Sequence, residues 1–302
     1  MFTVLAVHQF VLCSLFCFLL QYLKGILYSY NDTTTDSNIV TGEIIAALTA
    51  TKQALDQSYE AGETITYAIS LVNSAPGALS GLTLTDNLGA YAFGSQTLVP
   101  LTYVSDSLYF YVNGVQQPTP VITSTSPLTV SGLSIPAGGN AILIYNATAN
   151  EYAPLDIEAS ITNTGSVTGS ALVAPVTFTE TIGKDTAPKL SICKSLSPET
   201  ITENGEITYT FLIQNTGNLP AGLAENVIIT DIFQPVLNNL TVTYNGTIWS
   251  EPANYTYDET TGTFQTVPGS ITVPAATFTQ NPVTGVWSTI PGATIIRVTG
   301  TI

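Results

Sequence analysis

The chain has 302 residues, which is enough for two domains of ordinary size, and its 45% content of hydrophobic residues excludes a disordered polar tract. Only 9% of the residues are charged, so Thr, Ser, Asn and Gln must fill much of the surface, and Thr favours strands. Six basic residues against a net charge of −15 exclude a surface that neutralises phosphates. We therefore expect no nucleic-acid partner.

The reactive residue types also exclude several kinds of site. His8, the only histidine, lies in the apolar N-terminus, so the rest of the chain cannot form a Ser-His-Asp or Cys-His nucleophile. Cys13, Cys17 and Cys193 provide neither a disulfide framework nor metal-ligand spacing. Paired carboxylates of the glycosidase type are compatible with the composition, but nothing in the sequence brings two together. We therefore predict a non-enzymatic protein without catalytic, metal-binding or cofactor-binding residues.

The N-terminus, residues 1–30, resembles a signal or anchor segment and is expected to be helical. Residues 2–23 contain no charged residue, and the densest apolar run, 10–20, has the length of a signal-peptide core. About twenty residues would also span a bilayer as a helix. No basic residue precedes the run and no A-x-A-like site follows it. Three interpretations stay open: an export signal, an uncleaved membrane anchor through residues 2–23, or an altered start that is not the functional N-terminus.

The remainder of the chain contains an internal repeat. Residues 52–73 read KQALDQSYEAGETITYAISLVN, and residues 194–215 read KSLSPETITENGEITYTFLIQN. Three pairs share one offset of 142 positions: Lys52 and Lys194, Tyr67 and Tyr209, and Asn73 and Asn215. Further matches follow in the same order, including LTLTD ending at Asp86 and VIITD ending at Asp231. Ordered matches of this kind indicate two copies of one unit.

Within each copy, apolar and polar residues alternate with a period of two. Such alternation places one set of side chains on a core face and the other towards solvent, as in a strand; it covers Ile65, Tyr67, Ile69 and Leu71 in the first copy and Ile207, Tyr209, Phe211 and Ile213 in the second. The pairs Asn113-Gly114 and Asn245-Gly246 lie between apolar segments and predict tight hairpins. Many short strands with turn signals predict β-sandwiches. Only Gly42–Leu55 carries a weak helical period.

These residues resemble the domain of unknown function 11 repeat. The likeness rests on the order Lys, Gly-Glu, Thr-Tyr, Asn and Thr-Asp, followed by a Gly/Pro-rich turn, and it covers roughly residues 45–302. The resemblance implies an all-β fold of tandem immunoglobulin-like sandwiches on bacterial or archaeal surface proteins, without catalytic activity. It also implies an extracellular or cell-surface location.

The predicted domains are a first sandwich at 44–185 and a second at 186–302. The first copy ends with a closing strand around residues 159–167, whereas the second reaches Ile302 before such a strand. We therefore expect the second sandwich to lack its last strand. The chain would then be a fragment of a longer repeat protein.

Two functions fit these features. The first is a structural stalk of the cell envelope, whose partners would be other surface-repeat domains or cell-wall and glycan components. The alternative is an adhesin that binds a glycan or protein through loops at one end of a sandwich. The segments 118–127 and 249–257 are candidate loops, in which Trp249 and Tyr255 could stack on a sugar.

One candidate chemistry is an intramolecular isopeptide bond. Lysine is rare, yet it opens both copies at the same place, as Lys52 and Lys194. In a sandwich, a buried lysine on an early strand can attack an asparagine on the last strand with the assistance of a buried carboxylic acid. In the first copy these residues would be Lys52, Asn163 and Asp86. The alternative is that both lysines lie at the surface beside an apolar strand.

Overall fold

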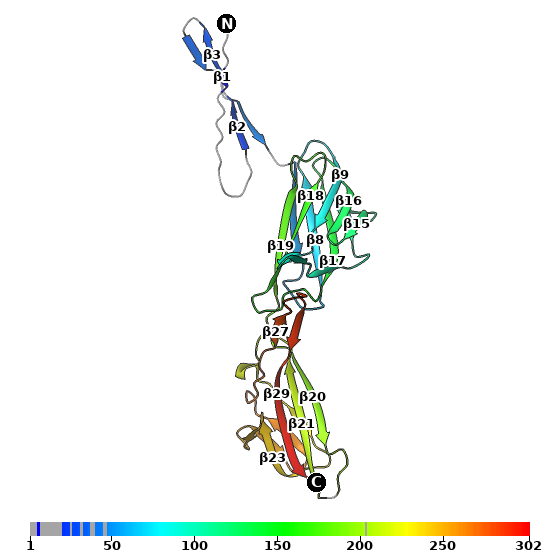
Figure 1. The fold of residues 1–302 in the computed structure, drawn as a ribbon, viewed down its shortest axis with the longest axis vertical. Helices are drawn as coiled ribbons and strands as arrows, with labels where there is room; N and C mark the ends of the chain where they lie inside the picture. The colour runs from blue at the N-terminus through cyan, green and yellow to red at the C-terminus, as the bar shows by residue number, and fades with distance from the viewer. Residues whose placement is uncertain are drawn as a thin grey trace.

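The computed structural model describes residues 47–202 and 204–302 together with five short backbone strands before them (Figure 1). These strands are β1 (Leu5–Ala6), β2 (Leu20–Lys24), β3 (Ile26–Tyr30), β4 (Thr33–Asp36) and β5 (Val40–Ile44). The helix predicted for residues 1–30 falls largely on 7–19, which lie outside the described residues. Where 20–24 and 26–30 are described, they are strands, because Leu20–Lys24 pairs antiparallel with Val40–Ile44 and Leu27–Tyr30 pairs with Thr33–Asp36.

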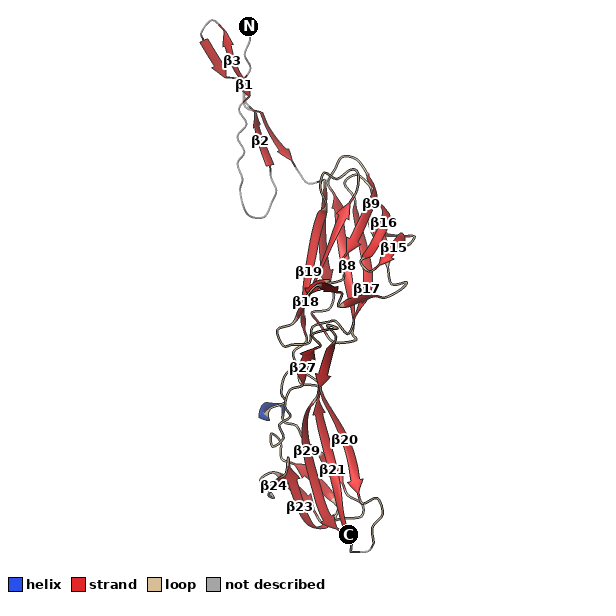
Figure 2. Ribbon diagram, in the orientation of Figure 1, coloured by secondary structure: helices blue, strands red, loops and turns tan. Residues whose placement is uncertain are grey.

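Apart from one short 3-10 turn, η1 (Leu223–Glu225), all regular elements of the described part are strands (Figure 2). The all-β prediction is confirmed. The weak helical period at Gly42–Leu55 was misleading, since β5 and β6 (Leu48–Ala54) occupy it. None of the described helices is long and apolar enough to cross a membrane.

The first sandwich consists of two six-stranded sheets. One sheet has the order β14-β13-β17-β8-β6 with β12 also on β17, and the other has the order β15-β16-β9-β18-β19-β7. Its strands are β6, β7 (Ser58–Tyr59), β8 (Thr64–Asn73), β9 (Leu79–Asp86), β12 (Leu101–Tyr103), β13 (Tyr109–Val112), β14 (Val115–Gln117), β15 (Val121–Thr125), β16 (Leu128–Ile135), β17 (Asn140–Ala149), β18 (Ser160–Thr168) and β19 (Val176–Lys184), with the separate hairpin β10 (Tyr91–Phe93) and β11 (Gln96–Leu98).

The second sandwich has fewer strands. Its larger sheet has the order β20-β21-β29-β23-β24, facing a three-stranded sheet β22-β26-β25, and the hairpin β27-β28 extends beyond them. The strands are β20 (Leu190–Ser197), β21 (Glu206–Asn215), β22 (Thr230–Ile232), β23 (Asn238–Tyr244), β24 (Thr247–Trp249), β25 (Tyr255–Asp258), β26 (Thr263–Thr266), β27 (Thr277–Gln280), β28 (Trp287–Ile290) and β29 (Gly292–Thr301).

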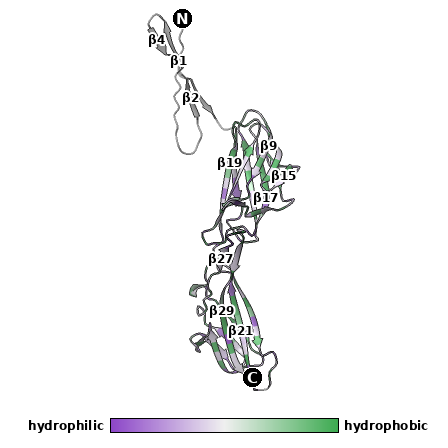
Figure 3. Ribbon diagram, viewed as in Figure 1, coloured by the Kyte–Doolittle hydropathy of each residue, from purple (hydrophilic) through white to green (hydrophobic). Residues whose placement is uncertain are grey.

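Each sandwich has its own hydrophobic core, built by the predicted alternation (Figure 3). In β8 the side chains of Ile65, Tyr67, Ile69 and Leu71 are fully buried. In β21 the corresponding Ile207, Tyr209, Phe211 and Ile213 are buried in the second core. Burial of these alternate apolar side chains removes apolar area from water, which contributes about 25 cal/mol of stabilisation per Å2 and is the main term that stabilises each sandwich.

The two predicted Asn-Gly hairpins are confirmed. Asn113-Gly114 connects β13 to β14, with Val112 opposite Val115, and both turn residues have positive φ, 49° and 78°. Asn245-Gly246 connects β23 to β24 in the same way, with φ of 49° and 85°. Two consecutive positive φ angles are what a type I′ turn requires, and Asn-Gly adopts them at the least cost.

The two sandwiches lie end to end (Figure 1). Lys189 at the start of the second sandwich forms an ion pair with Glu60 of the first. The β27-β28 hairpin reaches the first sandwich, where the Trp287 amide donates to the Glu151 carbonyl at 2.9 Å. Nearby, Gln280 donates to the Tyr91 hydroxyl at 3.1 Å. These contacts connect the two units directly.

Candidate cross-linking site

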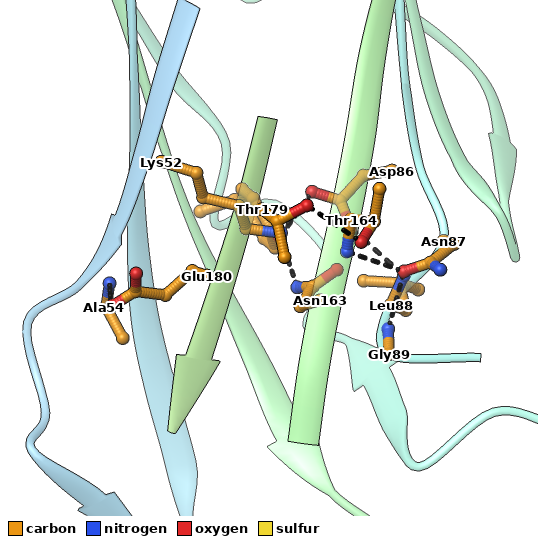
Figure 4. A network of polar contacts seen from close by, with 11 residues as sticks. Lys52, Ala54, Asp86, Asn87, Leu88, Gly89, Asn163, Thr164, Thr179 and Glu180 are labelled. Carbon is orange, nitrogen blue, oxygen red and sulfur yellow. Dashed lines mark hydrogen bonds and ion pairs between the residues drawn. The ribbon is translucent and has the colours of Figure 1, made fainter. Parts of the chain in front are cut away.

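The three residues predicted for an isopeptide bond meet inside the first sandwich (Figure 4). Lys52 extends from β6, Asp86 ends β9, and Asn163 lies on β18, so the group bridges the two sheets. Asp86 and Asn163 are fully buried and Lys52 is 4% exposed. The alternative that Lys52 lies at the surface is wrong.

Lys52 and Asp86 form a buried ion pair. Lys52 Nζ lies 2.6 Å from Asp86 Oδ2, and neither side chain contacts solvent. The other carboxylate oxygen, Oδ1, accepts a hydrogen bond from the Leu88 amide at 3.0 Å. Burying a charged group away from water costs free energy. A fully buried ion pair therefore forms only where the packing of the fold holds both side chains in place. Here β19 lies over β6, and Glu180 of β19 accepts a hydrogen bond from the Ala54 amide at 3.2 Å.

Tyr145, on β17, joins the acid to the amide. Its hydroxyl donates to Asp86 Oδ2 at 2.8 Å and accepts from Asn163 Nδ2 at 3.2 Å. The ring stacks on Tyr67 at a centroid distance of 5.5 Å. Sequence analysis missed Tyr145, because only the register of β17 against β8, with Tyr145 opposite Tyr67, places it beside the pair.

The surroundings of the Lys52 amine favour its neutral form more than water does. Burial disfavours the ammonium form and lowers the pKa of Lys52 from 10.5 to about 8, although Asp86 opposes this shift. Nζ also lies 4.6 Å from the Tyr67 ring centroid, so aromatic rings surround it. A neutral amine has a free lone pair, whereas an ammonium group has none.

Asn163 supplies the carbonyl group that such an amine could attack. Its Oδ1 is buried and accepts no hydrogen bond among the described residues. Backbone pairing fixes the position of Asn163, because Gly165, two residues further along β18, lies opposite Asp86. A side chain at Gly165 would collide with the Phe178 ring and lie 3.0 Å from the Thr85 carbonyl oxygen, so glycine permits this close approach.

The second sandwich holds the corresponding lysine and aspartate in a more open setting. Lys194 of β20 pairs with Asp231 of β22, but the two side chains are 40% and 21% exposed. Lys194 Nζ lies 4.6 Å from the Tyr209 ring centroid, the distance that Lys52 keeps from Tyr67. The register gives Val298 opposite Tyr209, where the first copy has Tyr145.

The two predicted ligand loops differ: residues 250–254 within 249–257 do connect β24 to β25, whereas 118–127 contains a strand. Residues 121–125 within 118–127 are strand β15, paired with β16. Trp249 is 8% exposed and stacks on Tyr244 with ring centroids 4.8 Å apart. Tyr255 is 6% exposed and packs on Phe264 in the core. Their rings fill the sandwich interior and its edge, so they do not present a free face to a sugar.

In each copy a buried asparagine at the end of a strand holds the adjoining segments in place through its side-chain amide. The sequence did not reveal this role. Asn73 is fully buried, and its Nδ2 donates to the carbonyls of Gly77, Ile135 and Pro136. Asn215 is also fully buried and donates to the carbonyls of Leu219 and Pro274. The shared spacing therefore has a structural cause: an amide side chain satisfies loop carbonyls that would otherwise lack partners.

In the described part of the chain, no cluster of three or more His, Cys, Asp or Glu could hold a metal ion. Comparison with protein-family models finds no match. Comparison with curated proteins finds none either. The resemblance to the domain of unknown function 11 repeat therefore stays a prediction.

Solved structures give loose matches, three of which are pilus proteins. The major pilin SpaD of Corynebacterium diphtheriae is 8% identical, with 89% of this chain and 70% of that chain covered and a TM-score of 0.34. The pilus backbone of Streptococcus pneumoniae is 11% identical, with 82% and 55% covered and a TM-score of 0.31, so this chain spans about half of it. The major pilin of Bacillus cereus is 10% identical, with 90% and 81% covered and a TM-score of 0.31. At such TM-scores no function follows from the likeness.

Proposed function

We propose that the chain is a non-enzymatic structural module of an extracellular stalk, whose first sandwich is closed by an isopeptide bond between Lys52 and Asn163. The observation that carries the proposal is the buried network of Lys52, Asp86, Tyr145 and Asn163. A buried lysine-aspartate pair is by itself weak support for stability, because the cost of desolvation offsets its attraction. Its link to the Asn163 amide through the Tyr145 hydroxyl is what supports a chemical role for the pair.

The reaction needs no cofactor. A proton passes from Lys52 to Asp86, which leaves a neutral amine and a neutral acid in the apolar interior. The amine attacks Cγ of Asn163, while the proton of Asp86 stabilises the developing charge on Oδ1. A bond forms between Nζ and Cγ, the bond between Cγ and Nδ2 breaks, and the amine proton leaves with Nδ2 as ammonia. Atoms and charge balance without an oxidant.

Such a bond suits a protein that transmits force. Lys52 lies near the start of the first sandwich, and β18, which carries Asn163, is the penultimate strand before the second sandwich. A load applied along the chain would pass from Lys52 directly to Asn163 and bypass residues 53–162. The strands between them would then carry no tension.

The surface and the junction are consistent with this role. A net charge of −15 with few basic residues keeps the protein soluble outside a cell. The ion pair of Lys189 with Glu60 and the contacts of the β27-β28 hairpin connect the sandwiches lengthwise. The adhesin alternative has no comparable support, since Trp249 and Tyr255 are buried.

The test is tryptic mapping of the purified chain. Trypsin does not cleave after a lysine that is acylated on Nζ, so a cross-linked protein should yield one peptide spanning residues 25–184. Its mass should be about 17 Da below the sequence value, because ammonia is lost. Asn163→Ala should restore cleavage after Lys52 and the full mass. Complete cleavage after Lys52 in the folded wild-type protein would refute the cross-link.

A further inference from the structure

Formation of the cross-link requires a proton to travel from the amine to the amide. After Lys52 Nζ attacks Cγ of Asn163, Nζ holds one proton too many, whereas Nδ2 needs one more to leave as ammonia. The exposed fractions of Lys52, Asp86 and Asn163 are 4%, 0% and 0%. Because bulk water does not reach groups buried to this extent, a side chain of the fold has to carry the proton.

The Tyr145 hydroxyl connects the acid to the departing nitrogen. Its Oη donates to Asp86 Oδ2 at 2.8 Å and accepts from Asn163 Nδ2 at 3.2 Å. The same Oδ2 lies 2.6 Å from Lys52 Nζ. Among the described residues, no other hydroxyl forms hydrogen bonds with both this acid and this amide. A continuous path therefore runs from the amine through Oδ2 and Oη to Nδ2.

The second oxygen of the acid lies outside this path. Asp86 Oδ1 accepts a hydrogen bond from the Leu88 amide at 3.0 Å. An acid that keeps this bond carries its proton on the other oxygen. That oxygen, Oδ2, faces both Lys52 and Tyr145, so it can take a proton from one side and give a proton on the other.

Packing on β17 holds the Tyr145 ring in place and keeps its hydroxyl neutral. The ring stacks on Tyr67 with centroids 5.5 Å apart and packs on Tyr103 at 6.3 Å. Burial and then the charge of Asp86 raise the pKa of Tyr145 well above its usual value. A neutral hydroxyl can give one proton and accept another in the same step, so it passes a proton on without becoming charged.

We infer that Tyr145 is a catalytic residue of the cross-linking reaction, whose hydroxyl carries the proton from Asp86 to the departing nitrogen of Asn163. In the tetrahedral adduct, Oη gives its proton to Nδ2 and takes the proton of Oδ2, while Oδ2 takes one from Nζ. The bond between Cγ and Nδ2 then breaks, and ammonia leaves. The Tyr145 hydroxyl is restored and Asp86 ends as a neutral acid, so protons and charge balance. This inference rests on the cross-link proposed between Lys52 and Asn163.

The test compares the rate of cross-linking in the wild-type chain, in Tyr145→Phe and in Tyr103→Phe. Each chain of 302 residues is made by cell-free synthesis, and the loss of about 17 Da is followed over time by intact mass. Tyr145→Phe should react at least about 100-fold more slowly, because a positioned proton donor contributes that much or more.

Tyr103→Phe is the matched control. It removes a buried hydroxyl from a ring that packs on Tyr145, and this hydroxyl has no hydrogen-bond partner among the described residues. The Tyr103→Phe chain should therefore form the cross-link at the wild-type rate. An equal slowing in both variants would overturn the inference, because the effect would then come from altered packing of the rings.

A second measurement separates proton transfer from a defect in folding. Circular dichroism shows whether Tyr145→Phe has folded. In addition, 3-fluorotyrosine in place of Tyr145 keeps the ring and the hydroxyl but makes the hydroxyl more acidic. The rate of cross-linking should then change, since the rate of proton transfer follows the acidity of the carrier. The same replacement at Tyr103 should leave the rate unchanged.

The outcomes distinguish the role of Tyr145 from the cross-link itself. Equal rates for the wild type and for folded Tyr145→Phe would overturn the inference while the cross-link stands. A rate that 3-fluorotyrosine in place of Tyr145 leaves unchanged would do the same. A wild-type chain that folds and never loses 17 Da would overturn the proposed cross-link, and the role of Tyr145 with it.

Discussion

The two sandwiches contain the same lysine, aspartate and aromatic ring but differ in what surrounds them. Lys52 and Asp86 are enclosed because β18 and β19 complete the first sandwich, whereas Lys194 and Asp231 are partly exposed because no described strand takes that place. The same residue types therefore form a fully buried ion pair in one copy and a partly exposed ion pair in the other. Enclosure, more than residue identity, decides what the pair can do.

The largest expected difference comes from removing the acid. Asp86→Ala should abolish the cross-link, which closes a loop of about 100 residues and is worth about 4–5 kcal/mol by chain entropy. The variant also leaves Lys52 buried without its partner. The Tm of the first sandwich, measured by calorimetry, should therefore fall by roughly 10–20 °C. Asp231→Ala is the matched control and should cost about 1 kcal/mol, because its ion pair is partly solvated. Equal losses for the two variants would contradict the distinction between them.

The pH dependence of an uncross-linked first sandwich should be the next largest effect. In Asn163→Ala, Lys52 has a pKa of about 8 when folded and about 10.5 when unfolded, so the unfolded chain binds more protons between these values. Stability must therefore increase as pH rises from 8 to 10, by about 2 kcal/mol. Above pH 10 the gain should reverse, because burial raises the pKa of Tyr67 and Tyr145.

Urea unfolding at several pH values measures this effect. Adding Lys52→Met and Asp86→Leu to the same variant removes both titrating groups and should flatten the profile between pH 8 and 10. A decrease in stability over that range in Asn163→Ala itself would show that Lys52 is not desolvated.

The last expected effect is one that the sandwiches share. Asn73→Ala and Asn215→Ala should each lower the free energy of unfolding by about 1–3 kcal/mol, because both leave buried loop carbonyls without donors. Calorimetry should resolve one unfolding transition for each sandwich, so each loss of stability can be assigned to its own sandwich. If Asn215→Ala had no effect while Asn73→Ala did, the two asparagines would not have equivalent roles, despite their common spacing.

The sequence by itself determined the class of fold and named the residues proposed for the cross-link. Alternation with a period of two, Asn-Gly turns and the repeated lysine are local signals, because each depends on side chains only a few residues apart. They located Lys52, Asp86 and Asn163 on three strands before any contact between those strands was known. Local patterns also gave errors: a helix was expected over 1–30, where 20–24 and 26–30 are strands, and a loop was expected over 118–127, where 121–125 are a strand.

Only the tertiary structure decided which side chains are enclosed and which partners they meet. Tyr145 joins the site through strand register, and the cover of β19 over β6 lowers the pKa of Lys52 by desolvation. Trp249 and Tyr255 could be binding residues or core residues until packing placed them inside. Burial depends on residues distant in sequence, and it sets the free energy of charged groups. For that reason the sequence named Lys52 and Lys194 as matching residues, and only the assembled sheets determined that Lys52 is buried while Lys194 is partly exposed.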